Sequence, residues 1–412
     1  MLWFLRPIWR ADFPPNTDGP AHWALVEAMH HLSDPSHLLA QTFEGGIFPA
    51  PNSMQYLLVW VFGTFVGTAK AGLLVMLLAS ALVPVGLARY LRAYGWSPWL
   101  ALTALPFMYQ WAVFEGFTDY VLGCGVFLLQ LASMEAYLRR PTKRGAVLLA
   151  ALGGLVFLAH VQAFLYFVLA TGLRMAVRLV SDIRRRFPKG FLRPHVLTWS
   201  ITWGVALLLL VAWWLQTPAH LSSDIESTTL VMPNPSERLA ALFSRTVIVL
   251  EGDQDAKATL LYILGLMLAA FVARFAWSPT EQEDGRARWF GWVFPIVIFA
   301  LLLAAPMNLG DYYNFWTRIP GFLGVLAVPL LFPQTGSAPL GPVRKGAVAA
   351  LLVAGVSLFP PALNRSIDVW NGFTAGLEEV LDAAEPQTHL AYYPEYRGPT
   401  GFGESPLYRH LS

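Results

Sequence analysis

The sequence predicts an all-α integral membrane protein, a polytopic bundle of about ten transmembrane helices. Of the 412 residues, 56% are hydrophobic and only 13% are charged, whereas a soluble domain carries about 25% charged residues. The apolar residues gather in runs that approach or reach the length needed to cross about 30 Å of hydrocarbon. These runs are 71–90, 97–114, 118–138, 145–160, 161–180, 196–215, 257–276, 289–305, 316–333 and 346–363.

Basic residues fall between these runs in a pattern that predicts an orientation. They cluster at every second loop, and the positive-inside rule places such clusters in the cytoplasm. The loops at 115–118, around His160, at 216–256 and at 306–315 then face outward, as does the tail at 364–412. The basic clusters are Arg89 with Arg92, Arg139 to Arg144, Arg178 to Arg193, Arg274 to Arg288, and Arg344 with Lys345.

The residues before the first full run form an expected outward segment at 1–69. Met1–Trp9 is too short to span and is interpreted as the remnant of a first helix. Residues Gly19 to Leu32 have the mixed helical spacing of a helix that lies on the membrane surface. Met54–Thr68 is interpreted as a second juxtamembrane helix, because a true span there would move the basic clusters outside.

The transmembrane bundle is then expected at 70–363, with the large outward loop 216–256 inside it. The outward tail at 364–412 is too short for a substantial core of its own, and a truncated soluble domain is one interpretation of it. Cys124 is the only cysteine, which excludes an intramolecular disulfide and a cysteine-based metal cage. The net charge of +2 gives no sign of nucleic-acid binding, and no nucleic-acid partner is expected.

Polar side chains at the outward ends of the helices are the candidates for chemistry. If the topology is right, all of them converge on one membrane face. Ionisable residues near membrane depth are costly to keep and tend to mark function. The four groups are Asp18 with His22, Glu115 with Asp119, His160 with Gln162, and Tyr312 with Arg318.

Asp18 has two interpretations that are compatible with one another. It is a candidate general base, and with Glu115 and Asp119 it is a candidate ligand for a hard divalent cation, Mg or Mn. The alternative is structural, because Asp followed by Gly-Pro starts a helix well and Asp18 would cap it. Asp119 has the same alternative, as the cap of the helix that follows Glu115.

We expect the remaining candidates, His22, His160, Tyr312 and Arg318, to contact the substrate. For His160 the simpler interpretation is an interhelical hydrogen bond at a tight hairpin. Arg318 is suited to a lipid phosphate through paired hydrogen bonds, or it reaches to the interface with its head in water. The histidines without convincing metal spacing, interpreted as solvated, are His30, His31 and His37.

Several segments resemble the GT-C superfamily of membrane glycosyltransferases, which use polyprenyl-phosphate-linked sugars. The resemblance covers about residues 12–200 and is closest to poorly characterised bacterial members. Three residues separate Glu115 from Asp119, where the metal-binding pair of the family is separated by one. The segments are Thr17-Asp-Gly-Pro-Ala-His22, Pro49-Ala-Pro-Asn-Ser-Met-Gln-Tyr56, Leu87-Ala-Arg-Tyr-Leu-Arg-Ala-Tyr-Gly95, Phe114-Glu-Gly-Phe-Thr-Asp-Tyr-Val-Leu-Gly123 and Ala159-His-Val-Gln162.

The resemblance implies transfer of a sugar, with inversion, from a polyprenyl phosphate in the membrane to an outward-facing acceptor glycan, lipid or protein. Asp18 would deprotonate the acceptor hydroxyl, and Arg318 or a metal would stabilise the leaving phosphate. The implied location is a bacterial inner membrane with the active face outward. The alternatives are a lipid or solute transporter or flippase, and a catalytically inactive subunit of the same superfamily.

Overall fold

The computed structural model is helical wherever the chain is described, and no strand occurs among those residues. The all-α class expected from the sequence is therefore confirmed. The structure describes residues 2–376 with gaps at 13–14, 17, 38–39, 42–47, 110, 185–191, 217–231, 248–259, 269, 271–284, 307–314, 328–329, 331 and 333–341, together with Glu379 and Ala383.

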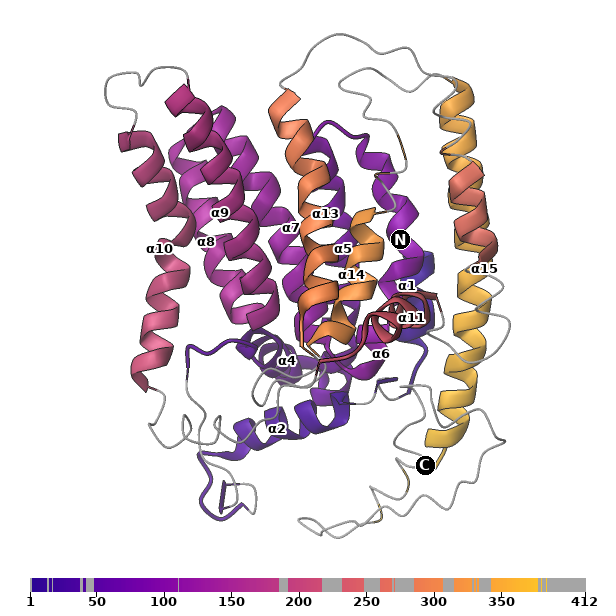
Figure 1. The fold of residues 1–412 in the computed structure, drawn as a ribbon. Helices are drawn as coiled ribbons and strands as arrows, with labels where there is room; N and C mark the ends of the chain where they lie inside the picture. The colour runs from indigo at the N-terminus through magenta and orange to yellow at the C-terminus, as the bar shows by residue number, and fades with distance from the viewer. Residues whose placement is uncertain are drawn as a thin grey trace.

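Long helices stand side by side and form a bundle, and two shorter helices lie across its lower end in Figure 1. The shorter pair is α2 (Gly19–His31) and α4 (Ser53–Val66). We call the end that they cover the α2 end. The long helices are α5 (Thr68–Ala93), α7 (Thr118–Arg139), α8 (Lys143–Ala159), α9 (Val161–Arg184), α10 (Leu192–Gln216), α13 (Gly285–Ala304) and α15 (Pro342–Thr374).

Four helices of the described chain are long and apolar enough to cross a membrane, namely Thr68–Ala93, Thr118–Arg139, Val161–Ile183 and Pro194–Gln216. These helices support the membrane class. They do not establish the expected ten spans, because some expected runs form shorter helices and others lie partly outside the described residues. α8, for example, has 17 residues, and the expected run at 257–276 is described only at 260–268 and 270.

The expected run at 97–114 is not one α-helix. It forms η1, a 3₁₀-helix of 12 residues at Pro98–Tyr109, followed by the short helix α6 (Trp111–Glu115). A 3₁₀-helix rises about 2.0 Å per residue, against about 1.5 Å in an α-helix, so η1 is about 24 Å long. Because each residue of η1 rises further along the axis, a short stretch of chain reaches back to the α2 end.

α2 and α4 are held on the bundle by a small apolar cluster of their own, separate from the main core. α4 has 14 residues, about 21 Å of helix, which is shorter than a hydrocarbon layer. Trp23 of α2 packs on α5 at Gly72, where an added Cβ would lie 2.4 Å from the indole ring. The buried members of this cluster are Trp23, Val26, Val59, Ala71 and Val75.

The opposite end of the bundle gathers the described basic clusters. Arg139 at the end of α7 donates to the Ala93 carbonyl at the end of α5, at 2.6 Å. Arg174 of α9 makes two hydrogen bonds to Glu135 of α7, at 2.9 and 3.0 Å. The Tyr90 hydroxyl bonds the Gly291 carbonyl and brings the start of α13 to the same end. The ends of α5 and α7 and the start of α13 thus meet at one end, in agreement with the alternation of basic loops in the sequence.

Both chain ends of the described region meet at the α2 end. α1 (Leu2–Trp9) leads to Arg10, whose guanidinium lies 2.8 Å from the Asp368 carboxylate. Asn371 donates its side-chain amide to the Arg10 carbonyl at 2.9 Å. These partners of Arg10 belong to α15, which continues as one helix to Thr374. The sequence had suggested that an outward tail begins at position 364.

The large loop 216–256 contains a helix, α11 (Pro235–Val247). At its start the Glu237 amide donates to the Asn234 side chain at 2.8 Å and the Asn234 amide donates to the Glu237 side chain at 2.9 Å, which is a capping box. The buried guanidinium of Arg238 donates to the carbonyls of Leu302 and Ala305 at the end of α13. Carbonyls at a helix end lack intrahelical partners, so Arg238 ties α11 to α13.

The close approach of α5 and α7 gives the first prediction. A Cβ on Gly125 would lie 2.9 Å from the Leu82 carbonyl carbon, which belongs to the backbone and cannot rotate away. Gly125→Ala should therefore lower the free energy of unfolding by about 1–3 kcal/mol, as overpacking does. Unfolding by SDS titration in mixed micelles measures it. Gly204→Ala on α10 is the matched control, because nothing lies within 4 Å of its added Cβ; equal losses would contradict the proposed packing.

The ion pair between α7 and α9 gives the second prediction. The side chains of Arg174 and Glu135 are 9% and 3% exposed, so removing one partner leaves a buried charge. Glu135→Ala should cost about 3–5 kcal/mol of unfolding free energy. Arg139→Ala should cost about 1 kcal/mol or less, because the Arg139 side chain is 54% exposed. The same titration compares them, and a larger loss for Arg139→Ala would refute the assignment.

Candidate functional site

The first loop is bonded directly to the turn between α6 and α7. The Asp18 amide donates to the Glu115 carbonyl at 3.0 Å. Gly116, which follows Glu115, has a φ of 103°, and an added Cβ would lie 2.7 Å from the Cβ of Asp18. Only glycine fits this backbone and this approach. The structure thus places Asp18 beside the turn between α6 and α7 at one end of the bundle, as the sequence predicted.

Asp18 occupies the N-cap position of α2, but its side chain makes no capping hydrogen bond. Pro20 lies in the first turn and has no amide hydrogen to offer. The Asp18 side chain therefore does not have the capping role that was its structural alternative. The carboxylate is half-buried and keeps its oxygens for other partners, while the helix start favours its negative charge.

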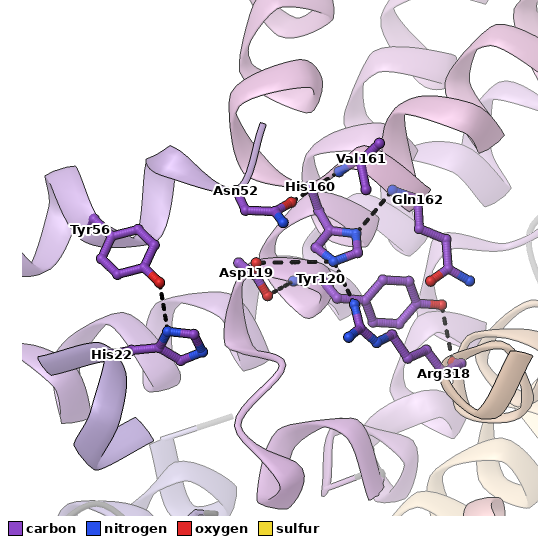
Figure 2. A network of polar contacts seen from close by, with 9 residues as sticks. All are labelled: His22, Asn52, Tyr56, Asp119, Tyr120, His160, Val161, Gln162 and Arg318. Carbon is purple, nitrogen blue, oxygen red and sulfur yellow. Dashed lines mark hydrogen bonds and ion pairs between the residues drawn. The ribbon is translucent and has the colours of Figure 1, made fainter. Parts of the chain in front are cut away.

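Asp119 is in the first turn of α7, one residue inside the helix. The N-cap position belongs to Phe117, so the expected capping role of Asp119 is wrong. One Asp119 oxygen accepts the amide of Tyr120 at 2.7 Å. The other lies 4.0 Å from Nε2 of His160, at the junction of α8 and α9. Figure 2 shows Asp119 between the His22 side and the Arg318 side of the site.

His160 is a neutral ring in contact with a guanidinium. Its Nδ1 lies 3.1 Å from the amide nitrogen of Gln162, and its Nε2 lies 2.8 Å from Nη1 of Arg318. A neutral imidazole accepts a hydrogen bond at one of its nitrogens, whereas an imidazolium accepts at neither and would meet a donor at each. The neutral ring therefore fits these contacts better than the charged one, and Arg318 is the cation. The expected interhelical hydrogen bond is present, and it reaches a third element.

Arg318 points into the protein. The residue is 8% exposed, and its guanidinium carbon lies 3.7 Å from the centre of the Phe117 ring, a cation–π contact. A side chain that reached out to water would not be buried in this way. The guanidinium presents a flat set of donors, which suits a phosphate or carboxylate.

The backbone that carries Arg318 is held from two helices. It ends η3 (Trp316–Arg318), just before α14 (Ile319–Ala327). The Tyr120 hydroxyl of α7 donates to the Arg318 carbonyl at 3.0 Å. The Gln162 amide of α9 donates to the Phe315 carbonyl at 2.9 Å. Figure 2 shows Tyr120 and Gln162 on the same side as Arg318.

A second polar pair joins α2 to α4 beside these residues. Nδ1 of His22 lies 2.6 Å from the Tyr56 hydroxyl. Burial, with the charges of Asp119 and Asp18 adding to it, raises the pKa of Tyr56 to about 12. The phenol therefore keeps its proton at neutral pH. Asn52, just before α4, accepts the amide of Val161 at 3.1 Å and ties this side to the start of α9.

The three carboxylates expected to bind a metal do not form one group. Glu115 is 5% exposed and buried in α6, and Asp119 is turned to the Tyr120 amide and His160. Across the described residues, no three His, Cys, Asp or Glu side chains are close enough to hold an ion together. The expected divalent-cation set of Asp18, Glu115 and Asp119 stays a prediction.

Sequence reasoning missed some residues of this site and named one that falls outside it. Tyr56, Phe117 and Tyr120 were not singled out, because aromatic residues near helix ends are common in membrane proteins. Tyr312 lies outside the described residues. Gln162 was noted only as a neighbour of His160.

In comparisons with known proteins, no family model matches the chain, and neither does any curated protein or solved structure. What the site can do therefore follows from its own residues.

Proposed function

We propose that this protein is a membrane glycosyltransferase, which moves a sugar from a polyprenyl phosphate to a hydroxyl of an outward-facing acceptor. One observation carries the proposal. The buried guanidinium of Arg318 lies at the same end of an apolar bundle as the carboxylate of Asp18, which makes no capping hydrogen bond. A base and a fixed cation are the two groups that displacement of a phosphate by an alcohol requires.

The roles divide between these groups. Asp18 accepts the proton of the acceptor hydroxyl as its oxygen attacks the anomeric carbon of the donor sugar. The bond between that carbon and the phosphate oxygen breaks, and the phosphate leaves with the electron pair and its negative charge. Arg318 stabilises this charge, and neutral His160 adds none of its own. Attack opposite the leaving group inverts the anomeric carbon.

The proposal includes an arrangement in the membrane. About ten helices cross a bacterial inner membrane, with the α2 end outward and the end that carries Arg139 in the cytoplasm. The grouping of the basic clusters at one end supports it. α4 adds support, because it lies across the bundle and exposes Trp60 and Phe65 to 40% and 81%, as an interfacial helix does.

A transporter is the second candidate, and one observation favours it. Gln130 is fully buried within α7, and neither its amide nitrogen nor its carbonyl oxygen has a hydrogen-bond partner in the described structure. Transporters place polar groups in mid-membrane. A flux assay in proteoliposomes separates the two functions, because only transport moves the polyprenyl-phosphate sugar between leaflets. Neither flux nor transfer by folded protein would favour an inactive subunit.

The role of Asp18 gives the third prediction. Asp18→Asn keeps the size of the side chain and removes the base, so kcat for sugar transfer should fall about 10²–10⁴-fold, with KM little changed. Radiolabelled transfer from polyprenyl-phosphate sugar to membrane acceptors measures it. Asp12→Asn, exposed in the same loop, is the matched control and should keep full activity. Undiminished turnover in Asp18→Asn would remove Asp18 as the base.

Arg318 gives the fourth prediction. Arg318→Lys keeps a cation but loses the planar set of donors that reaches His160 and a phosphate together. The expected fall in kcat is about 10²–10³-fold, the size found when one donor to a developing anion is lost. The control is Arg10→Lys, whose guanidinium is 42% exposed in its ion pair with Asp368. Activity of Arg318→Lys equal to that of the control would show that Arg318 only packs.

A further inference from the structure

The pair formed by His22 and Tyr56 has a short hydrogen bond that no step so far uses. Tyr56 Oη and His22 Nδ1 are 2.6 Å apart, and the rings meet edge to face with centroids 5.5 Å apart. Both residues come from the helices that cover the α2 end, His22 from α2 and Tyr56 from α4. The contact lies beside Asp119 in Figure 2.

The direction of this hydrogen bond follows from the surroundings of the phenol. Burial and two neighbouring carboxylates keep Tyr56 protonated, so its O–H has to find an acceptor. Its one hydrogen-bond partner in the described structure is Nδ1 of His22. When the phenol donates, Nδ1 accepts, and in a neutral imidazole the hydrogen is then on the other nitrogen. This direction of the hydrogen bond holds the ring as the Nε2–H tautomer.

The second ring nitrogen of His22 is Nε2. In Figure 2 it lies on the side of the ring away from Tyr56. The His22 amide donates to the Asp18 carbonyl at 3.1 Å. Residues four apart on a helix present neighbouring side chains, with Cβ atoms about 5–6 Å apart. His22 and Asp18 therefore lie on neighbouring positions of one face at the start of α2, where one ligand can meet both.

We propose that Tyr56 is a positioning residue that locks His22 in the Nε2–H tautomer, and that His22 donates this hydrogen to an oxygen of the acceptor beside Asp18. An acceptor with two neighbouring oxygens, such as a glycan, meets both groups: one hydroxyl gives its proton to Asp18 and the next oxygen accepts from His22. The substrate contact rests on the proposed function, whereas the tautomer lock does not.

The lock is tested without any activity, by ¹⁵N NMR of histidine-labelled full-length protein in nanodiscs. Loss of one set of ring signals in His22→Gln assigns them among the nine histidines. The neutral ring of wild-type His22 should show a protonated Nε2 and an unprotonated Nδ1. Tyr56→Phe should shift both signals toward a tautomer mixture. A protonated Nδ1 in the wild type, or unchanged signals in Tyr56→Phe, would overturn the lock.

The substrate contact is tested by two substitutions that imitate the two nitrogens. The glutamine amide reaches the place of Nε2–H and the asparagine amide that of Nδ1, so His22→Gln should keep about tenfold more kcat than His22→Asn. Tyr56→Phe should lower kcat of the wild type about tenfold. Equal loss in both His22 variants would refute the contact. Absence of transfer by the wild type would instead refute the proposed function, and the NMR result would still decide the lock.

Discussion

The hydrogen bond between Arg318 and His160 is the interaction on which the α2 end depends. A guanidinium withdrawn from water is costly unless its hydrogens are met, and this one is 8% exposed. The contact requires an uncharged ring at the junction of α8 and α9, and a backbone carrying Arg318 that cannot swing away. Tyr120 and Gln162 supply the second condition from α7 and α9. One buried cation thereby sets the relative position of three elements.

The two ends of the bundle handle charge in different ways. At the end opposite α2, Glu135 takes two hydrogen bonds from Arg174, and the pair is closed within the protein. At the α2 end, the Asp18 carboxylate makes no capping hydrogen bond, and Arg318 contacts the rings of His160 and Phe117. A closed ion pair holds helices together, whereas a carboxylate without a capping role, at the same end as a fixed cation, is suited to a reacting ligand. This difference is why the proposed chemistry is placed at the α2 end.

Much of the candidate site could be predicted, because the end of the bundle at which each residue lies follows from the basic clusters at every second loop and not from contacts. Alternating basic loops put Asp18, Asp119, His160 and Arg318 at one end, and the helices bring them there. The alternation of basic loops does not predict which side chains at that end contact one another. It could not show that Asp119 turns to the Tyr120 amide, nor that Glu115 is buried. Tyr56 was missed because an aromatic in an apolar helix has no local mark of function.

The sequence alone determined which segments are apolar and at which end of the bundle each loop lies. Apolar runs exclude water along their length, and the basic loops between them define two faces. Only the tertiary structure decided which polar groups touch. His160 and Arg318 are 158 residues apart, and His22 and Tyr56 come from separate helices joined through a loop. Hydrophobic periodicity reports the environment of one helix at a time. The partner that makes an imidazole neutral, or fixes its tautomer, comes from another helix and enters only when the helices pack.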